Sequence, residues 1–243
     1  MGRMSPPSIT ARLGEGPVGR PSPDWTVIMP VKPPSLGKTR LGTTVPVRAA
    51  LSRAMAVDTI EAVSRCPAVD RIIVVTEDVD VASEAASVAR FVDPLLIDVH
   101  PRPGRTADGA EPALIAAVDR GAEVAGRSCH RAALLADLPS LAPRDLARAL
   151  RAAIRVERGI VADATTSGTT LLTARADVEW RSSYGRHSYL RHLALGHVDL
   201  PTEPGSTLRF DVDTRRDLEA ARRRGVGPRT AGVLSTAPEA AWT

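Results

Sequence analysis

The chain contains two lysines, Lys32 and Lys38, and both lie in one stretch, VIMPVKPPSLGKTRL, although its Lys plus Arg content is 32. Every other basic residue is therefore an arginine. A lysine ammonium is a compact point charge, whereas an arginine guanidinium is a planar fork, so the pair favours positions that require a point charge. The apolar run Thr26 to Val31 predicts a buried strand, and the Pro- and Gly-containing segment after it predicts a strand-to-helix loop.

A strand-to-helix loop of this kind is a common binding site for an anion. Ligands of open α/β sheets lie beyond the carboxyl ends of the strands, so we expect Lys38 to meet an anion beside the N–H groups of a helix N-terminus. A solvated basic loop is the alternative. The run GKT at residues 37–39 is not a Walker P-loop, because that motif requires a glycine where this chain has Lys32.

Three aspartates are candidates for holding a metal ion. Asp137 directly follows the apolar run LLA, and Asp211 and Asp213 form a DVD segment at the end of another apolar run. Residues two apart in an extended segment point to the same face, so the DVD carboxylates form a hard oxygen site suited to Mg²⁺. A DxD pair alone is a weak signal, since Asp78 and Asp80 form another before an ordinary helix. Position at a strand end favours the first three.

Two hydroxyl-rich turns are candidates for binding phosphate. One contains Gly168, Thr169 and Thr170, and the other contains Gly185 and Ser188. Backbone N–H and hydroxyl groups bind phosphate in such turns, but Gly, Ser and Thr are also the usual residues of purely structural turns. The five histidines lack HExxH spacing and the two cysteines lack CxxC spacing, so a zinc site is not expected.

The segments that must position these residues predict an α/β fold. Apolar, β-branched runs alternate with helical periodicities, and no internal repeat is evident. We expect one domain at residues 25–230, an N-terminal tail at 1–24 whose composition resists ordering, and a C-terminal tail at 231–243. The expected strands are 26–31, 71–76, 90–92, 131–136, 160–162, 169–173, 197–200 and 208–212, and residues 93–110 are expected to form a long loop.

The amino-acid composition favours some classes of binding partner and argues against others. A formal charge of +4 and a pI of about 9.7 favour anionic ligands, but the 3% aromatic content argues against nucleic acid bound by base stacking. No apolar run approaches the roughly 18 residues of a membrane span, and the N-terminus lacks the apolar core of a signal peptide. With no disulfide pattern either, we expect a cytoplasmic protein without a membrane partner.

Five motifs occur in a recognisable order: VIMPVKPPSLGKTRL, ADLPSL, GTTLL, YGRHS and LRFDVDTRRDLEAARRRGVG. Together they resemble the phosphoenolpyruvate or 2-phospho-L-lactate guanylyltransferases of coenzyme F-420 biosynthesis, from Val27 to about Thr230. The resemblance implies a single-domain Rossmann-like nucleotidyltransferase fold, similar to molybdenum-cofactor guanylyltransferases, with a mostly parallel mixed sheet and helices on both faces. It implies transfer of GMP from GTP to a small phosphorylated acid, pyrophosphate release, and a downstream F-420 biosynthesis transferase as a partner.

The resemblance also implies roles for individual residues. The expected GTP-binding residues are Lys32, Lys38 and Arg40, and the expected catalytic residues are Lys32, Lys38 and Asp137. The expected Mg²⁺ ligands are Asp137, Asp211 and Asp213, and the expected acceptor-binding residues are Thr169, Gly185 and Ser188.

Two departures from the family pattern bear on guanine selection. The family usually has Gly where this chain has Ala136 and often has Asn where it has Glu111, although an acid can still accept the N–H donors of guanine. Two alternatives remain, a DxD metal-dependent glycosyltransferase and a non-catalytic basic anion-binding protein. The acceptor, among phosphoenolpyruvate, 2-phospho-L-lactate and 3-phosphoglycerate, and the oligomeric state are left open.

Overall fold

The computed structural model describes residues 25–34, 38–89, 91–97 and 109–242. They form a seven-stranded sheet with the order β3-β2-β1-β4-β6-β5-β7. Four of the strand pairs are parallel, whereas β6 runs antiparallel to β4 and β5. The expected α/β class and mostly parallel mixed sheet are confirmed. The strands are β1 Trp25–Val31, β2 Val69–Thr76, β3 Val92–Leu96, β4 His130–Leu134, β5 Arg158–Ala162, β6 Thr169–Ala174 and β7 Val198–Asp199.

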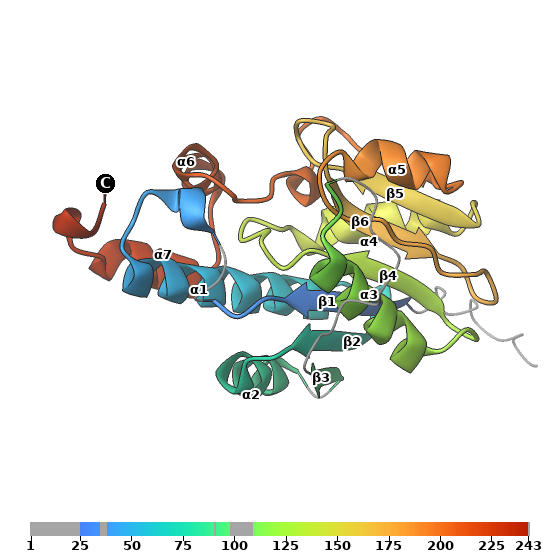
Figure 1. The fold of residues 1–243 in the computed structure, drawn as a ribbon, viewed down its shortest axis with the longest axis horizontal. Coiled ribbons are helices and arrows are strands. Elements are labelled where there is room, and N and C mark those ends of the chain that lie inside the picture. Colours follow the sequence, from blue (N-terminus) through green and yellow to red (C-terminus); the bar gives the residue numbers. More distant parts are fainter. Residues whose placement is uncertain (1–24, 35–37, 90, 98–108, 243) are drawn as a thin grey trace, which may run out of the picture.

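Helices cover both faces of the sheet (Figure 1). All seven residues of the interior strand β1 are buried, as is typical of a parallel strand covered on both sides. Because successive strand residues point to opposite faces, Val27 and Met29 join the hydrophobic layer under α1, α2 and α4, and Ile28 joins the layer under α3 and α5. The α-helices are α1 Val45–Ser64, α2 Val79–Val88, α3 Pro112–Ala125, α4 Pro143–Ala153, α5 Ser188–Ala194, α6 Arg215–Arg224 and α7 Pro228–Thr236.

A third hydrophobic cluster ties the C-terminal helices to the segment before α1. Leu41, in the 3-10 helix Thr39–Leu41, packs with residues of α1, α6 and α7, and α7 lies alongside α1 (Figure 1). Thr43 Oγ1 and the Thr44 N–H both donate hydrogen bonds to the Ala241 carbonyl oxygen, at 2.8 and 2.9 Å. The C-terminal residues therefore fix the segment that leads from the lysine loop into α1.

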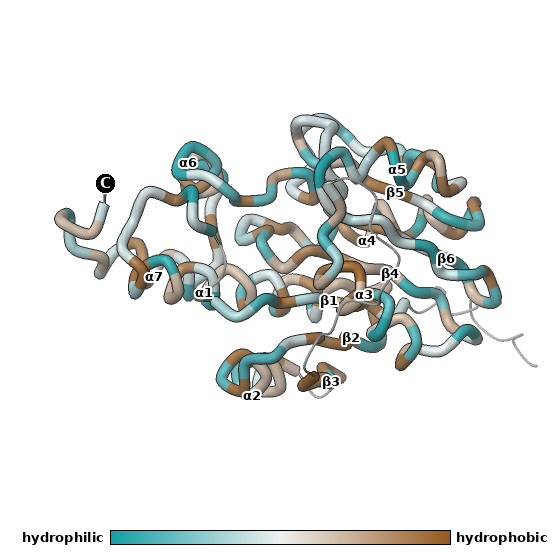
Figure 2. Tube along the Cα trace, in the orientation of Figure 1, coloured by the Kyte–Doolittle hydropathy of each residue, from teal (hydrophilic) through white to brown (hydrophobic). Residues whose placement is uncertain are grey.

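A capping box begins α6. The Thr214 side chain accepts a hydrogen bond from the Asp217 N–H, and the Asp217 side chain accepts one from the Thr214 N–H. Most of α6 is hydrophilic (Figure 2), and its buried residues are Leu218 and Ala221. The cap fixes the backbone directly after Asp213. None of the described helices combines the length and apolarity that a membrane crossing requires.

Two expected elements differ from the structure. Residues 208–212, expected to be a strand, instead lie partly in the 3-10 helix Thr207–Arg209 and continue as irregular backbone. Residues 93–110, expected to be a loop, contain most of β3, an edge strand whose Pro94 suits that position because an edge needs no second set of ladder hydrogen bonds. The expected domain boundary at residue 231 falls inside α7. The expected N-terminal tail, residues 1–24, and part of the expected loop, residues 98–108, lie outside the described residues.

Candidate active site

The lysine and aspartate candidates meet at one edge of the sheet, beyond the carboxyl ends of β1 and β4. The chain runs from β1 to β2 and β3 on one side and then returns to β4 on the other, so this edge is a topological switch point, where open α/β sheets bind ligands. Lys32 directly follows β1, and Asp137 lies in the loop after β4. The Val212 N–H donates a hydrogen bond to the Asp137 carbonyl oxygen at 3.0 Å, which brings Asp211 and Asp213 to the same edge.

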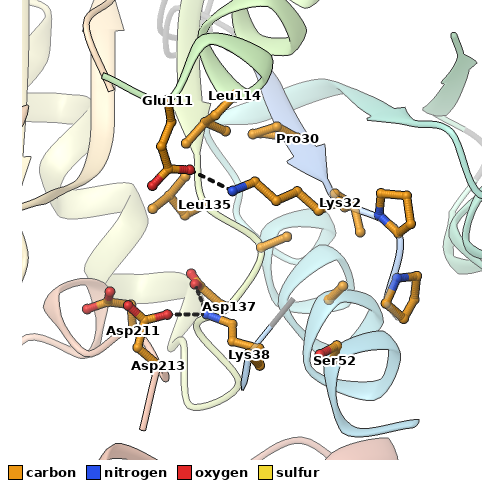
Figure 3. Close-up of a pocket in the computed structure, with 15 residues that line it drawn as sticks. Pro30, Lys32, Lys38, Ser52, Glu111, Leu114, Leu135, Asp137, Asp211 and Asp213 are labelled. Carbon is orange, nitrogen blue, oxygen red and sulfur yellow. Dashed lines mark hydrogen bonds and ion pairs between the residues drawn. The ribbon is translucent and has the colours of Figure 1, made fainter. Parts of the chain in front are cut away.

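Lys38 is the cation beside these aspartates (Figure 3). Its Nζ donates a hydrogen bond to Asp137 Oδ2 and another, at 2.7 Å, to Asp213 Oδ1. The second oxygen of Asp213 accepts a hydrogen bond from Arg40 Nη2 at 3.2 Å. The Lys38 side chain is 14% exposed and the Arg40 side chain 71%, so solvent screens the Arg40 pair far more.

Burial and like charges set the ionisation of this group. Burial alone would lower the pKa of Lys38, but the Asp137 and Asp213 carboxylates outweigh it and raise that pKa above its usual value. Burial likewise opposes the Asp213 carboxylate, but Lys38 and Arg40 lower its pKa. Burial, and then the charges of Asp137 and Asp213, raise the pKa of Asp211 to about 8. A bound cation would relieve this repulsion.

The three aspartates fit a divalent cation. Asp137, Asp211 and Asp213 each offer an oxygen, and these atoms lie within 4.8 Å of one another. Hard carboxylate oxygens are the donors that Mg²⁺ and Mn²⁺ prefer. Asp137 Oδ1 is buried and has no hydrogen-bond partner among the described residues, a state that normally requires a compensating group. The donor set therefore suits a metal ion, and the assignment of these residues as its ligands stays a prediction.

A second ion pair lines the same cleft. Lys32 Nζ lies 2.6 Å from Glu111 Oε2, and both side chains are about half exposed (Figure 3). The cleft measures about 230 Å³ and combines these charges with the apolar side chains of Leu114 and Leu135. A hollow of about 140 Å³, which reaches Val75, adjoins it across the end of β1. Apolar walls with a few placed polar groups are typical of small-molecule sites.

Two polar residues that line the cleft, Glu111 and Ser52, were not predicted as site residues from the sequence. In the sequence, Glu111 is notable only as a departure from the family pattern. In the structure it is the N-cap of α3 and pairs with Lys32. Ser52 lines the cleft from α1, and its Oγ is buried without a hydrogen-bond partner among the described residues. A single serine in a helix carries no sequence signal for such a position.

Gly185 helps to place Glu111. It forms an isolated β-bridge with Ala110, and the Glu111 N–H donates a hydrogen bond to the Tyr184 carbonyl oxygen at 3.0 Å. The φ angle of Gly185 is 122°, a value that side chains with a Cβ rarely adopt. Glycine is therefore required by this close approach of two backbone segments.

Gly185→Ala is expected to lower the free energy of unfolding by about 2–4 kcal/mol, because strain and overpacking combine. The new Cβ would lie 2.4 Å from the Gly109 carbonyl oxygen and 2.8 Å from Ala110 Cα. Gly196→Ala is the matched control, since Gly196 has a φ of +87° and, its chain neighbours aside, no described residue comes within 4 Å of the position that a Cβ would take. Urea unfolding measures both, and equal losses would contradict the contact argument.

Thr169 and Ser188 come together in a buried network and do not line the cleft of the aspartates. Ser188 Oγ donates a hydrogen bond to Thr169 Oγ1 at 3.3 Å, and Thr169 Oγ1 lies 2.9 Å from His192 Nδ1. His192 Nε2 accepts a hydrogen bond from the Ser183 N–H at 2.9 Å. Thr169 and Ser188 are each 2% exposed. The network supports the turn around Gly185, and acceptor binding by Thr169, Gly185 and Ser188 stays a prediction.

Acid is expected to destabilise the fold through two buried histidines. Burial lowers the pKa of His192 to about 3 and that of His197 to about 4, against about 6.5 in an unfolded chain. As the pH falls from about 6.5 toward 4, the unfolded chain binds protons that the folded chain excludes. Stability should therefore decrease by up to about 1.4 kcal/mol per histidine for each pH unit, and should not respond to these groups above pH 7.

Melting temperature measured against pH tests this expectation. His192→Gln should flatten the slope between about pH 6.5 and 4, because one of the two proton-binding differences is removed. The same substitution at the exposed His187 is the matched control and should leave the slope as in the wild type. A wild-type slope in the His192 variant would contradict the assignment.

No family model matches the chain. Three relatives, each called phosphoenolpyruvate guanylyltransferase, are similar over most of their length. The protein of Sanguibacter keddieii is 41% identical over 86% of this chain and 84% of its own length. Those of Thermomonospora curvata and Streptomyces coelicolor are each 40% identical, over 88% and 87% of this chain and 90% and 96% of their own lengths.

Two solved structures share the fold at low sequence identity. A protein assigned as a nucleotide-diphospho-sugar transferase from Desulfovibrio desulfuricans G20 has a TM-score of 0.55 and 17% identity, covering 88% of this chain and 94% of its own. A 4-diphosphocytidyl-2C-methyl-D-erythritol synthase has a TM-score of 0.51 and 15% identity, covering 83% and 99%. Since the curated relatives match nearly end to end at 40–41% identity, this chain belongs to the phosphoenolpyruvate guanylyltransferase family and is an enzyme of the nucleotidyltransferase class.

Proposed function

We propose that this enzyme transfers GMP from GTP to the phosphate of phosphoenolpyruvate, or alternatively of 2-phospho-L-lactate, and releases pyrophosphate, in coenzyme F-420 biosynthesis. The observation that carries the proposal is the position of Lys38 among three carboxylates at the switch point of the sheet. A site that concentrates fixed cations and metal-binding oxygens suits a reaction between two phosphate anions. The names of the relatives support the nucleotide and the acceptor.

The reaction forms a bond from an acceptor phosphate oxygen to the α-phosphorus of GTP. The bond from that phosphorus to the oxygen bridging to the β-phosphate breaks, and pyrophosphate carries the electron pair away. The attacking oxygen is already an anion, so no general base is required, and the residues of the site act by alignment and charge. A Mg²⁺ ion held by Asp137, Asp211 and Asp213 would neutralise phosphate charge.

The remaining cleft residues divide between the nucleotide and the acceptor. Lys32 and Arg40 have exposed side chains that contact phosphates as fixed charges. Glu111, at the start of α3, is an acceptor for the N–H donors of guanine. The turn around Gly185 adjoins Glu111 and forms the acceptor side, which Thr169 and Ser188 support through their hydrogen bonds.

This role implies a cytoplasmic enzyme whose partners are small molecules. GTP and the phosphorylated acid are its substrates, and a downstream F-420 biosynthesis transferase would take up the activated product. Neither role requires nucleic acid or a membrane.

Pyrophosphate release tests the proposal. The wild-type protein is assayed with Mg²⁺, GTP and one of phosphoenolpyruvate, 2-phospho-L-lactate or 3-phosphoglycerate, and then with ATP in place of GTP. We expect the fastest release with GTP and phosphoenolpyruvate. Transfer from a sugar nucleotide without pyrophosphate release would indicate a glycosyltransferase instead. Salt-dependent binding of polyanions without nucleotide turnover would indicate a binding protein.

A further inference from the structure

Lys38 occupies one oxygen on each of two carboxylates in the candidate metal group. Its Nζ hydrogen-bonds Asp137 Oδ2 and lies 2.7 Å from Asp213 Oδ1, and both carboxylates belong to the group that can hold a cation. A Mg²⁺ ion bonded to these two oxygens would lie about 2.1 Å from each. That position is inside the contact distance of the ammonium, so the ion and the ammonium exclude each other there.

The other oxygens of the two carboxylates are less accessible to an ion. Asp213 Oδ2 accepts a hydrogen bond from Arg40 at 3.2 Å, and Asp137 Oδ1 is buried away from solvent. A cation that binds Asp137 Oδ2 and Asp213 Oδ1, the oxygens that Lys38 holds, must therefore displace Lys38 from at least one of its partners.

We propose that Lys38 is a built-in counter-ion that holds Asp137 and Asp213 together until a divalent cation displaces it, after which its ammonium is released toward the nucleotide phosphates. The inference rests on the metal assignment within the proposed function. It deepens that function by making one residue serve both the metal and the nucleotide.

Displacement couples the two ligands. A largely buried ammonium that loses its carboxylates needs another anion, because an unpaired buried charge is strongly unfavourable. The phosphates of a nucleotide that binds beside the cation provide that anion. Metal binding alone is therefore opposed by Lys38, and metal binding together with a nucleotide is favoured, which is a coupling between two ligands through one side chain.

Lys32 is the natural control for this behaviour. Its Nζ pairs with Glu111 at 2.6 Å, outside the group of three aspartates, and its side chain is 53% exposed against 14% for Lys38. The chain has no third lysine. A comparison of the two lysines therefore covers every lysine side chain of the protein.

The first experiment measures metal affinity without a nucleotide. Mn²⁺ is titrated into the wild type, Lys38→Met and Lys32→Met, and free Mn²⁺ is read from its electron paramagnetic resonance signal. Removal of the competing ammonium is expected to tighten Mn²⁺ binding about tenfold or more in Lys38→Met. Lys32→Met removes a charge that acts on Asp213 without a hydrogen bond to it, and should therefore tighten Mn²⁺ binding far less. A Lys38→Met protein that binds Mn²⁺ no more tightly than the wild type overturns the inference.

One further variant separates this inference from the metal assignment. Asp137→Asn should lose most Mn²⁺ binding, and Mn²⁺ binding at wild-type strength would overturn both the assignment and the displacement that depends on it. Guanylyl transfer is not measured in any of these titrations. Tighter binding by Lys38→Met would therefore support the inference even if phosphoenolpyruvate proved not to be the acceptor.

The second experiment uses the unmodified protein and needs no variant to fold. The wild type is treated briefly with an amine-acetylating reagent, with and without saturating Mg²⁺, and the modified peptides are quantified by mass spectrometry. Mg²⁺ should raise the acetylation rate of Lys38 several-fold, because the displaced amine is no longer held between two carboxylates, and should leave the rate at Lys32 unchanged. Equal Lys38 rates with and without Mg²⁺ overturn the inference.

Discussion

Asp137→Asn and Asp211→Asn are each expected to reduce Mg²⁺-dependent pyrophosphate release about a hundredfold or more while leaving the protein folded. An amide keeps the shape of the carboxylate and removes the negative charge that holds the cation. Both residues belong to the group whose oxygens lie within 4.8 Å of one another. Steady-state rates with GTP and the best acceptor measure the effect.

In Asp211→Asn, a loss of activity should not be accompanied by a loss of stability. Burial and the neighbouring carboxylates raise the pKa of Asp211 to about 8, so its ionised form is disfavoured in the folded protein. Asp211→Asn removes that like-charge repulsion, and its melting temperature should equal or exceed that of the wild type. A large fall in melting temperature would show that the carboxylate has a structural role instead.

The second DxD pair of the chain offers a matched control. Asp80 lies in the first turn of α2 and pairs with Arg53 at 3.2 Å on the surface. Asp80→Asn should keep wild-type turnover, because a solvent-screened pair contributes little and lies outside the cleft. Near-normal turnover in Asp137→Asn and Asp211→Asn as well would remove the metal assignment.

Much of this site could be predicted because strand ends are visible in the sequence. The apolar runs before Lys32 and Asp137 became β1 and β4, and neighbouring parallel strands bring their carboxyl ends to one edge. The apolar run before Asp211 correctly predicted that Asp211 lies at this edge of the sheet, but the predicted strand is not the cause. Its apolar residues predicted a strand, but in the structure the hydrogen bond from the Val212 N–H to the Asp137 carbonyl oxygen joins that segment to the loop after β4.

The partners of each side chain could not be predicted, because they are far apart in the sequence. Lys38 and Asp213 are separated by 175 residues. The Thr169 hydroxyl meets a histidine 23 residues later, and no local pattern distinguishes that partner from a ligand phosphate. A run rich in Gly, Ser and Thr therefore predicts a turn in the backbone. It does not predict which groups the hydroxyls contact, because those partners are set by the fold.

The partners of the C-terminal helix α7 could not be predicted from its local sequence either. Pro228 at the start of α7 is a local helix signal, but the orphan N–H groups of its first turn are satisfied from another helix. The buried Asp58 carboxylate of α1 accepts hydrogen bonds from the Arg229 N–H at 3.2 Å and the Thr230 N–H at 2.8 Å. Because this cap comes from a distant part of the chain, the local sequence does not indicate it. Residues from 231 onward were therefore expected to form a tail.

Lys38→Ala is expected to lower kcat/KM about a hundredfold or more, as the loss of one preorganised charge donor typically does. In the proposed mechanism its ammonium offsets negative charge on the nucleotide phosphates as the α-phosphorus is attacked. Arg40 is the matched control, since it also pairs with Asp213 but is 71% exposed. Arg40→Ala should therefore reduce kcat/KM far less, because solvent already screens its charge.

Lys38→Arg should not restore the wild-type rate. The Lys38 side chain is 14% exposed and lies between Asp137 and Asp213, where a wider, planar guanidinium does not fit without shifting one of them. A shifted carboxylate or phosphate leaves the line of attack, and misplacement of this size is enough to slow an alignment-dependent reaction strongly. Steady-state kinetics, with circular dichroism to confirm folding, measures both variants. An Arg variant at wild-type efficiency would mean that only net charge matters at this position, and an Ala variant at wild-type efficiency would remove Lys38 from the active site.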